Sequence, residues 1–510
     1  MSQAYGTPVT RLPVAPLGAP PVAPLGAPPV APNVVPSVAM QLGRAAAIAY
    51  YGKTTPGRLV RALAVLVLLA VLAGALSVWA AMSIQNATRT IGMDAEPSVA
   101  IALRMAQSLS ELDAAALGDA LTDGGATTGT SLRFQAAMDQ LGADIVDAAK
   151  NITYGTAEAE PLRDMQRGLS MYERAVVEAR YIGAGNAWMT LHRLQWASRV
   201  NREFALPGAI ALSRVNEKEL EDAYSGYRAT SLLLGALAFA AFVLLVVALL
   251  AVQAWLARRT RRTLNLPLAG ATVVAALAGL WFGYTVLTER ADLRAAKEDA
   301  YDSLLVLFAA KGEVASLRGA VSLWLLDDAA QPEANARVGS ALRNLITGVD
   351  LTQPDQVRQF RERLGEALRA EQAGNDKQAL RIVSNFGGYL GKELGNITFG
   401  FAERQAATDS VTTLMHVVDV IRATQATDVR NRVLVVADWL RESGTGGAAA
   451  FLATQAALDR TIAVNQTEFD RRDRSARRTA ALLPYGVLGA LALTAGLAAG
   501  GLWQRLREYR

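Results

Sequence analysis

The stretch ATSLLLGALAFAAFVLLVVALLAVQAWLARRTRR, residues 229–262, decides the fold of this chain. Residues 229–257 contain no ionisable side chain, and about 20 apolar residues are enough for a helix to cross a bilayer. Arginine fills four of the five positions that follow. An apolar run that ends in a basic cluster is typical of a transmembrane helix that reaches the cytoplasmic face at that point. We therefore predict that residues 229–257 span a membrane.

Three further apolar runs are long enough for a membrane span. The first lies in 54–82, where Thr55-Pro56 provides a helix start, and the others are 266–287 and 480–503. Hydrophobic residues make up 52% of the 510-residue chain, and the mean hydropathy is +0.20. Both values agree with a membrane protein. We predict an all-α fold with four transmembrane helices and no cleavable signal peptide.

Basic residues gather at one set of span ends, which predicts the topology. They precede the first span, fill the loop between the second and third, and follow the fourth: Lys53, Arg58, Arg61, Arg258, Arg259, Arg261, Arg262, Arg505, Arg507 and Arg510. The positive-inside rule assigns these ends to the cytoplasm, so both termini would be cytoplasmic and the four arginines of 258–262 would form a cytoplasmic anchor. The first expected partner is the lipid bilayer of the cell (plasma) membrane. Five arginines in 471–478, just before the fourth span, favour the inverted topology and leave it as the alternative.

The four spans leave two long segments between them. We name 83–228 the first inter-span segment and 288–479 the second, and predict that both are extracytoplasmic helical domains. The remaining parts would be cytoplasmic: the N-terminal tail 1–53, the basic loop 258–265 and the C-terminal tail 504–510. Residues 14–32 repeat the motif Val-Ala-Pro-Leu-Gly-Ala-Pro-Pro, a composition typical of disordered tails, with a docking site for a proline-recognising partner as the alternative.

A near-repeat indicates that the chain is a duplicated unit. Asn-Ile-Thr-Tyr-Gly at 151–155 recurs as Asn-Ile-Thr-Phe-Gly at 396–400. Between the motif and the start of the next span the distance is 78 residues in the first case and 84 in the second. Before the motif, 68 residues follow Met82 in one copy and 108 follow Leu287 in the other. We therefore expect two span–bundle–span units, the second with an insertion before its motif.

Helical periodicity predicts four-helix bundles between the spans. In the first inter-span segment, helices are expected over 83–122, as a continuation of the first span, and over 131–150, 156–182 and 187–228, the last with a kink at Pro207. Gly183–Asn186 forms one of the connecting turns. Apolar residues recur at intervals of three and four in both segments: Ala102, Met105, Leu109, Leu112 and Ala116 in the first, and Phe451, Leu458, Ile462 and Phe469 in the second.

The repeated motif has a structural and a functional interpretation. Its Asn and Thr side chains can cap the following helix, and its glycine can end the preceding one. The sharper hypothesis is a polar niche for a ligand or partner, formed by Asn151, Thr153, Tyr154, Asn396, Thr398 and Phe399.

The chain offers little material for catalysis. It has no cysteine and two histidines, so we predict no metal, no cofactor and no enzymatic activity, and the uneven charge does not form a nucleic-acid-binding stripe. The acidic run in 217–222 reads as a solvated helix face, with weak cation binding as the alternative. Trp188, Trp196 and Trp324 are expected in the core. Small-residue pairs, Gly279 with Gly283 and Gly496 with Gly500, favour close helix contacts, although ordinary glycine content explains them equally well.

Three short motifs resemble the actinobacterial GlnX-type membrane proteins. They are Thr-Thr-Pro-Gly-Arg-Leu at 54–59, Ile-Thr-Tyr-Gly at 152–155 and Leu-Pro-Gly-Ala at 206–209. Those proteins have four spans and two outer segments, and the architecture is also similar to the input modules of chemoreceptors. The resemblance implies a relay from an extracytoplasmic amino-acid-binding lipoprotein to a soluble cytoplasmic Ser/Thr kinase. The proline-rich N-terminus departs from the pattern of that family.

These observations lead to one functional hypothesis and two alternatives. We expect a transmembrane sensor or signal relay that lacks its own output domain. A cell-envelope scaffold is the alternative. A transporter component is a remote one, because no span contains an ionisable residue beyond its first turn. An oligomer is compatible with the sequence.

Overall fold

The computed structural model describes residues 55–89, 96–122, 131–152, 155–260, 265–395, 401–426, 435–436, 439–440 and 446–507. The chain divides into two units, 1–61 and 62–510. The described part of the first unit is the helical start of α2. The second unit contains everything else and is described below.

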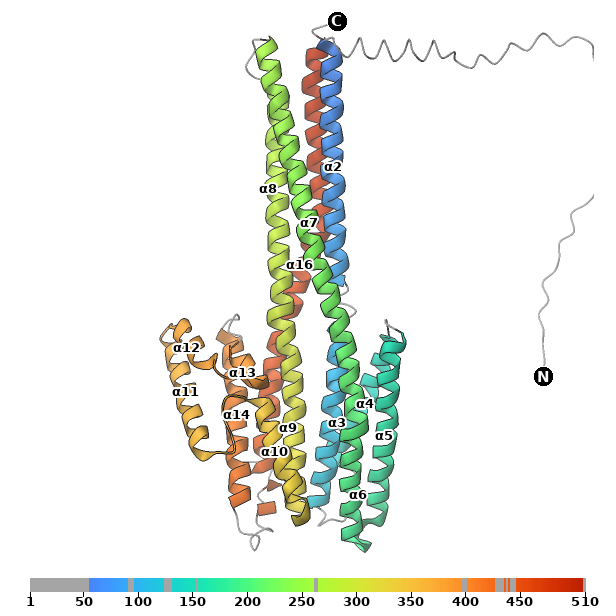
Figure 1. The fold of residues 1–510 in the computed structure, drawn as a ribbon, viewed down its shortest axis with the longest axis vertical. Helices are drawn as coiled ribbons and strands as arrows, with labels where there is room; N and C mark the ends of the chain where they lie inside the picture. The colour runs from blue at the N-terminus through green and yellow to red at the C-terminus, as the bar shows by residue number, and fades with distance from the viewer. Residues whose placement is uncertain are drawn as a thin grey trace, which may run out of the picture. The chain divides into compact units, whose positions relative to one another are not determined.

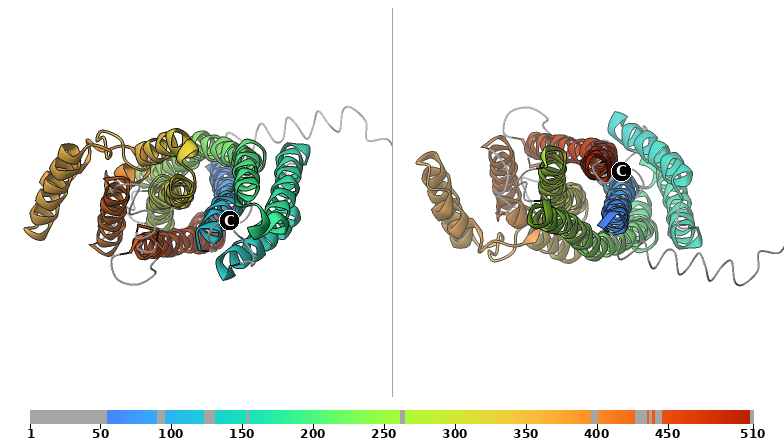
Figure 2. Two further views of the ribbon diagram at one scale, coloured as in Figure 1. Left: turned by 90° about the horizontal axis from the view of Figure 1, so that it is seen from below. Right: turned by 90° about the horizontal axis from the view of Figure 1, so that it is seen from above.

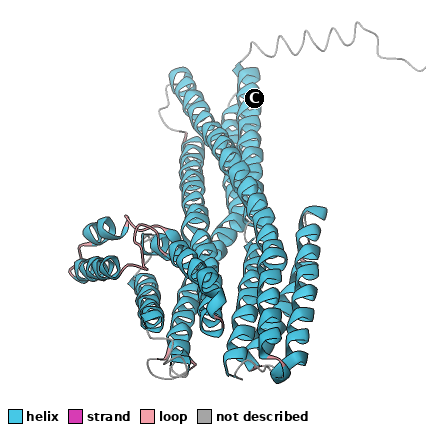
Figure 3. Ribbon diagram, turned by 60° about the horizontal axis from the view of Figure 1, so that its bottom comes forward, coloured by secondary structure: helices cyan, strands magenta, loops and turns pink. Residues whose placement is uncertain are grey.

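The described residues are helical almost throughout, as predicted (Figure 3). The only strand-type pairing among them is an isolated bridge between Thr347 and Gly387. Four helical stretches are long and apolar enough to cross a membrane, and each contains one predicted span: Gly57–Asn86, Trp188–Arg259, Leu266–Leu326 and Gly447–Arg505. The all-α fold with four candidate spans is therefore confirmed.

The span helices continue well beyond their apolar parts (Figure 1). They are α2 (Thr55–Arg89), α7 (Leu206–Thr260), α8 (Leu266–Arg294) and α16 (Gly447–Arg507). Within the spans α8 packs against both α7 and α16. Gly279 and Gly283 allow the α7 contact, because a Cβ at Gly279 would lie 2.9 Å from Phe242. The other predicted pair makes no such contact, since nothing lies within 4 Å of a Cβ at Gly496 or Gly500.

In the first inter-span segment, four helical rods surround one core. They are α3 (Glu96–Thr122), α4 (Leu132–Lys150), α5 (Thr156–Ile182), and α6 (Ala187–Val200) continued by η3 (Asn201–Ala205) into α7. The turn η2 (Gly183–Gly185) joins α5 to α6, where a turn was expected. All five predicted apolar positions of α3, from Ala102 to Ala116, are buried.

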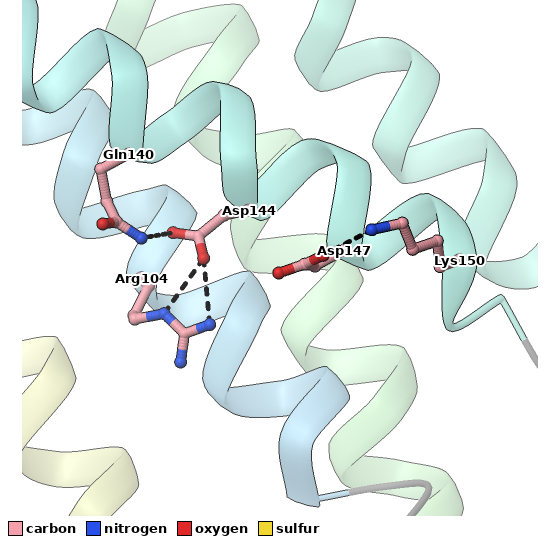
Figure 4. A network of polar contacts seen from close by, with 5 residues as sticks. All are labelled: Arg104, Gln140, Asp144, Asp147 and Lys150. Carbon is pink, nitrogen blue, oxygen red and sulfur yellow. Dashed lines mark hydrogen bonds and ion pairs between the residues drawn. The ribbon is translucent and has the colours of Figure 1, made fainter.

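A buried carboxylate fixes α4 to α3 (Figure 4). Asp144 Oδ1 accepts hydrogen bonds from Nε and Nη2 of Arg104 at 3.1 and 3.0 Å, and its Oδ2 accepts one from Gln140 at 3.1 Å. The Asp144 side chain is only 2% exposed, so the guanidinium compensates for the cost of burying its charge. Asp147 and Lys150 form a second, solvent-exposed pair on the same helix.

The second inter-span segment has more helices than the first. η4 (Ala295–Tyr301) connects α8 to α9 (Asp302–Leu326), and η5 (Asp328–Ala330) leads into α10 (Gln331–Leu345), α11 (Pro354–Gln372), α12 (Asp376–Val383), α13 (Gly388–Gly395) and α14 (Phe401–Ala426). The predicted apolar face of α16 contributes to the buried core, with Phe451 and Leu458 fully buried. The α11–α12 pair lies between α10 and α13 in the chain.

The two segments pack against each other, an arrangement that no sequence pattern predicted. α3 lies beside α9, and a Cβ at Gly319 would be 3.5 Å from the Cα of Ala114. Figure 2 shows this central group of helices end-on, with α4 and α5 to one side and α11 to the other. Contacts between the segments therefore run through helices that continue towards the spans.

The helix expected over 83–122 is described in two parts, the end of α2 up to Arg89 and α3 from Glu96; residues 90–95 lie outside the described residues, so its continuity stays a prediction. Two other details of the first segment differ from what was predicted. The irregularity expected at Pro207 lies one turn earlier, where η3 is a π-helix; proline lacks an N–H and clashes with the preceding turn, and the wider turn accommodates both effects. Trp188 and Trp196 are 69% and 43% exposed instead of buried.

Candidate functional site

The repeated motif is only partly described. Asn151 is the C-cap of α4, and its backbone N–H donates to the carbonyls of Ala148 and Asp147. Gly155, with a φ of 66°, is the N-cap of α5. The capping roles are thus the reverse of those predicted: the asparagine ends a helix, and the glycine precedes one. Thr153, Tyr154, Asn396, Thr398 and Phe399 lie outside the described residues, so the predicted niche stays a prediction.

The predicted cytoplasmic anchor begins inside a helix. Arg258 and Arg259 are exposed in the last turn of α7, where positive charge is favourable beside the partial negative charge of a helix C-terminus. Arg261 and Arg262 lie outside the described residues.

The structure adds a site that sequence reasoning missed, at the junction between spans and inter-span segments. A buried group of largely apolar residues joins α2, α3, α7, α8, η4, α9 and α16 there. We name it the junction cluster: Ile84, Val99, Leu220, Tyr224, Tyr227, Leu293, Ala296, Tyr301, Leu304, Phe308, Phe469 and Ala480. Every helix that leaves a span contributes side chains to the junction cluster. Because these side chains are closely packed, movement of one such helix displaces the others.

A buried carboxyl group lies beside the junction cluster. Glu289 of α8 is 1% exposed, and burial raises its pKa from 4.5 to about 7, against a hydrogen bond with Thr479 of α16 that lowers it. On the neighbouring helices, Gln85 of α2 donates a hydrogen bond to the carbonyl of Ala480 at 2.8 Å. Gln85, Glu289 and Thr479 lie outside the predicted spans, and Ala480 is the first residue of the fourth. The junction therefore combines apolar packing with a few specific polar contacts.

The arginines that precede the fourth span are neutralised mainly within α16. Arg471 and Arg472 both bind Glu468, at 2.7 and 2.6 Å, and Arg477 binds Asp473 at 2.8 Å. Arg474 donates a hydrogen bond to the backbone carbonyl of Asp470 at 2.8 Å.

Farther along the segments, a polar network crosses between α3 and the helices of the second segment. Arg318 of α9 donates to Glu111 of α3 at 3.1 Å, and Gln455 of α16 donates to the other oxygen of the same carboxylate. Asp113 lies 3.5 Å from Arg337 of α10 and accepts a hydrogen bond from Ser198 of α6 at 2.7 Å. Carboxylates of one segment are thus paired with guanidinium groups of the other.

Neither the potential metal ligands nor His192 gains a chemical role in the described part of the chain. Within the described ranges, no group of three or more His, Asp or Glu side chains could hold a metal ion. His192 stacks on exposed Trp188, with 5.5 Å between ring centroids.

The inter-segment network could not have been found from sequence, because its partners Glu111 and Arg318 are 207 residues apart.

Comparison with known proteins gives a family match for the first inter-span segment. Residues 87–225 match a family described as Actinobacterial sensor domain, which covers the first inter-span segment from the end of α2 into α7. This similarity fits a sensing role for that segment. No curated protein and no solved structure matches the chain.

Proposed function

We propose that this protein is a transmembrane signal relay of the plasma membrane without its own output domain. The observation that carries the proposal is the continuity of α7. This single helix extends from Leu206, inside the segment similar to sensor domains, through the second span to Thr260. A rigid helix can transmit a small translation or rotation along its axis, and α16 provides a second such rod in the other inter-span segment.

The proposed direction of signalling is inward. The positive-inside rule favours extracytoplasmic inter-span segments, with the loop 258–265 and both tails in the cytoplasm. On this proposal a separate protein reads the output from these cytoplasmic parts. The resemblance to GlnX-type proteins suggests an amino-acid-binding lipoprotein as the input partner and a soluble Ser/Thr kinase as the output partner.

Duplication of a span–bundle–span unit is part of the same proposal. In both halves the repeated motif lies in the chain just before a long helix, α5 or α14, that precedes a helix entering a span. The side-by-side packing of α3 and α9 supports a further step: the segments act as one input body, so that a signal on either reaches both pairs of spans.

The test is an interruption of α7. We would insert three glycines after Arg228, between the first segment and the second span, where each costs about 1 kcal/mol of helix stability. The matched control is the same insertion after Gly374, in the turn between α11 and α12. Phosphorylation by the cytoplasmic kinase would be compared with and without the external signal.

A relay requires the response to be lost in the Arg228 insertion and kept in the control, with both variants expressed in the membrane. An unchanged response in the Arg228 insertion would reject the relay. It would favour the alternative of an envelope scaffold, which needs no stiff connection between its outer part and its spans.

A further inference from the structure

We propose that a cavity between the two inter-span segments binds a linear organic polyamine. The cavity has a volume of about 770 Å³, within the range of pockets for small organic ligands. Its walls come from α3 and α7 of the first segment, and from η4, α9 and the α12–α13 region of the second. A ligand bound there would touch both segments.

Three carboxylates on three different walls define the charge of the cavity. Glu217 projects from α7, Asp302 from the start of α9 and Glu393 from α13. They do not gather into a metal site, because no group of three acidic or histidine side chains in the described part of the chain could hold a metal ion. Separated negative charges match a ligand whose positive charges are also separated.

The carboxylate of Glu393 marks the deepest of these positions. The residue is 8% exposed; its Oε1 accepts a hydrogen bond from Asn465 of α16 at 3.2 Å, and the side chain of Ser303 also hydrogen-bonds to the carboxyl group. Its other oxygen, Oε2, is buried and has no hydrogen-bond partner among the described residues. An unpaired buried acceptor is costly, and an ammonium group is the donor that would satisfy it best.

The two lysines of the cavity do not cancel this negative charge. Lys297 is already engaged: its Nζ lies 2.7 Å from Glu221 and 3.7 Å from Asp302, and it stands over the ring of Tyr224. Lys392 is exposed on α13. Counted together with Glu221, the partner of Lys297, four acidic side chains stand against two lysines at the cavity. The cavity therefore attracts cationic ligands.

Apolar side chains between the charged groups favour methylene chains. Leu103 of α3, Val306 of α9 and Phe386 before α13 line the same cavity. A polyamine alternates ammonium groups with short methylene spacers, so its charges would meet the carboxylates and its spacers would lie on these side chains. Compact cations and neutral solutes lack one of the two features.

The cavity borders the turn that connects the third span to the second inter-span segment, so a bound ligand would affect the spans through that turn. Lys297 lies within η4, the π-helical turn that joins span helix α8 to α9, and Asp302 follows that turn directly. Occupation of the cavity would alter the charge balance around this turn. Only this regulatory consequence rests on the proposed relay; binding itself does not.

The experiment measures binding of spermidine to the full-length protein by calorimetry, in nanodiscs of uncharged lipid and at low salt. We expect saturable binding that Glu217→Gln and Glu393→Gln each weaken by about tenfold, the usual effect of losing one charge-assisted hydrogen bond. Glu366→Gln on exposed α11 removes the same charge far from the cavity lining and should leave binding unchanged. If Glu393→Gln does not fold, the effect of Glu217→Gln on spermidine binding decides the test, because Glu217 is exposed and its substitution does not disturb the core.

A second comparison tests the class of ligand. Cadaverine and L-lysine share a methylene chain and an ammonium group, but L-lysine also carries a carboxylate that the acidic cavity should repel. We expect cadaverine to bind at least tenfold more tightly. The proposal is overturned if spermidine does not bind saturably, if Glu366→Gln weakens binding as much as Glu217→Gln, or if L-lysine binds as well as cadaverine. None of these outcomes depends on signalling, so they are distinguishable from failure of the relay.

Discussion

Arg318 of α9 donates a hydrogen bond to Glu111 of α3 at 3.1 Å, and this pair joins two segments that lie on opposite sides of the second and third spans in the chain. The guanidinium is 8% exposed and the carboxylate 20%. Burial lowers the pKa of Arg318, and the charge of Glu111 opposes that shift. The pair therefore contributes chiefly to the specific registration of α3 against α9.

The first prediction concerns this pair. Arg318→Met should destabilise the folded protein by about 3 kcal/mol or more, because it leaves a largely buried carboxylate without its cation. The double variant with Glu111→Gln should lose less, since it removes both charges. Thermal unfolding in detergent measures both effects.

The control for that prediction is an exposed ion pair. Arg358 and Asp355 on α11 lie 2.8 Å apart with side chains 71% and 78% exposed. Arg358→Met should change stability by less than about 1 kcal/mol. If Arg318→Met is equally mild, the inter-segment pair is not a determinant of the packing.

The second prediction concerns glycines where α5 crosses η3 and α7. A Cβ on Gly208 would lie 2.6 Å from the backbone nitrogen of Met165, and one on Gly168 would lie 2.4 Å from that of Ala205. Gly208→Ala should therefore cost about 1–3 kcal/mol through overpacking. Gly142→Ala on α4, where a Cβ meets nothing within 4 Å, should instead stabilise by about 1 kcal/mol. Equal melting temperatures for the two variants would contradict this packing.

The glycine contact also explains a motif that sequence analysis could only quote. Leu-Pro-Gly-Ala at 206–209 follows the π-helical turn directly, with the proline beyond the wider turn and Gly208 against α5. The spans, the turn at 183–186 and the apolar face of α3 were predictable, because each is encoded by neighbouring residues.

Long-range packing was not predictable in the same way. Nothing near Glu111 in sequence indicates Arg318, and periodicity alone does not distinguish a helix face that packs within its own segment from one that packs on the other. Trp188 illustrates the same limit: aromatic character favours burial, yet its position at the start of α6 leaves it exposed. An insertion before the second motif was expected, but no residue pattern predicted the α11–α12 pair.

The third prediction concerns topology. The chain has no cysteine, so single substitutions can be labelled without background. Arg358→Cys, at an exposed position of α11, should react with an impermeant thiol reagent in intact cells, whereas Arg259→Cys should react only after permeabilisation. Reversed labelling would mean that the arginines before the fourth span determine the orientation.

The last prediction uses the buried carboxyl group of Glu289. Its pKa is raised from 4.5 to about 7, first by burial, with a smaller contribution from Asp292 and an opposing hydrogen bond with Thr479. Between those two values the folded protein binds more protons at this site than the unfolded chain, so stability falls as pH rises. The stabilising effect of the neutral form is complete below pH 4.5 and is lost as pH passes about 7. Glu289→Gln mimics the neutral form at every pH. The melting temperature of the wild type relative to this variant should therefore decrease from about pH 5 to about pH 8. A constant difference over that range would show that Glu289 does not titrate there and would contradict the prediction.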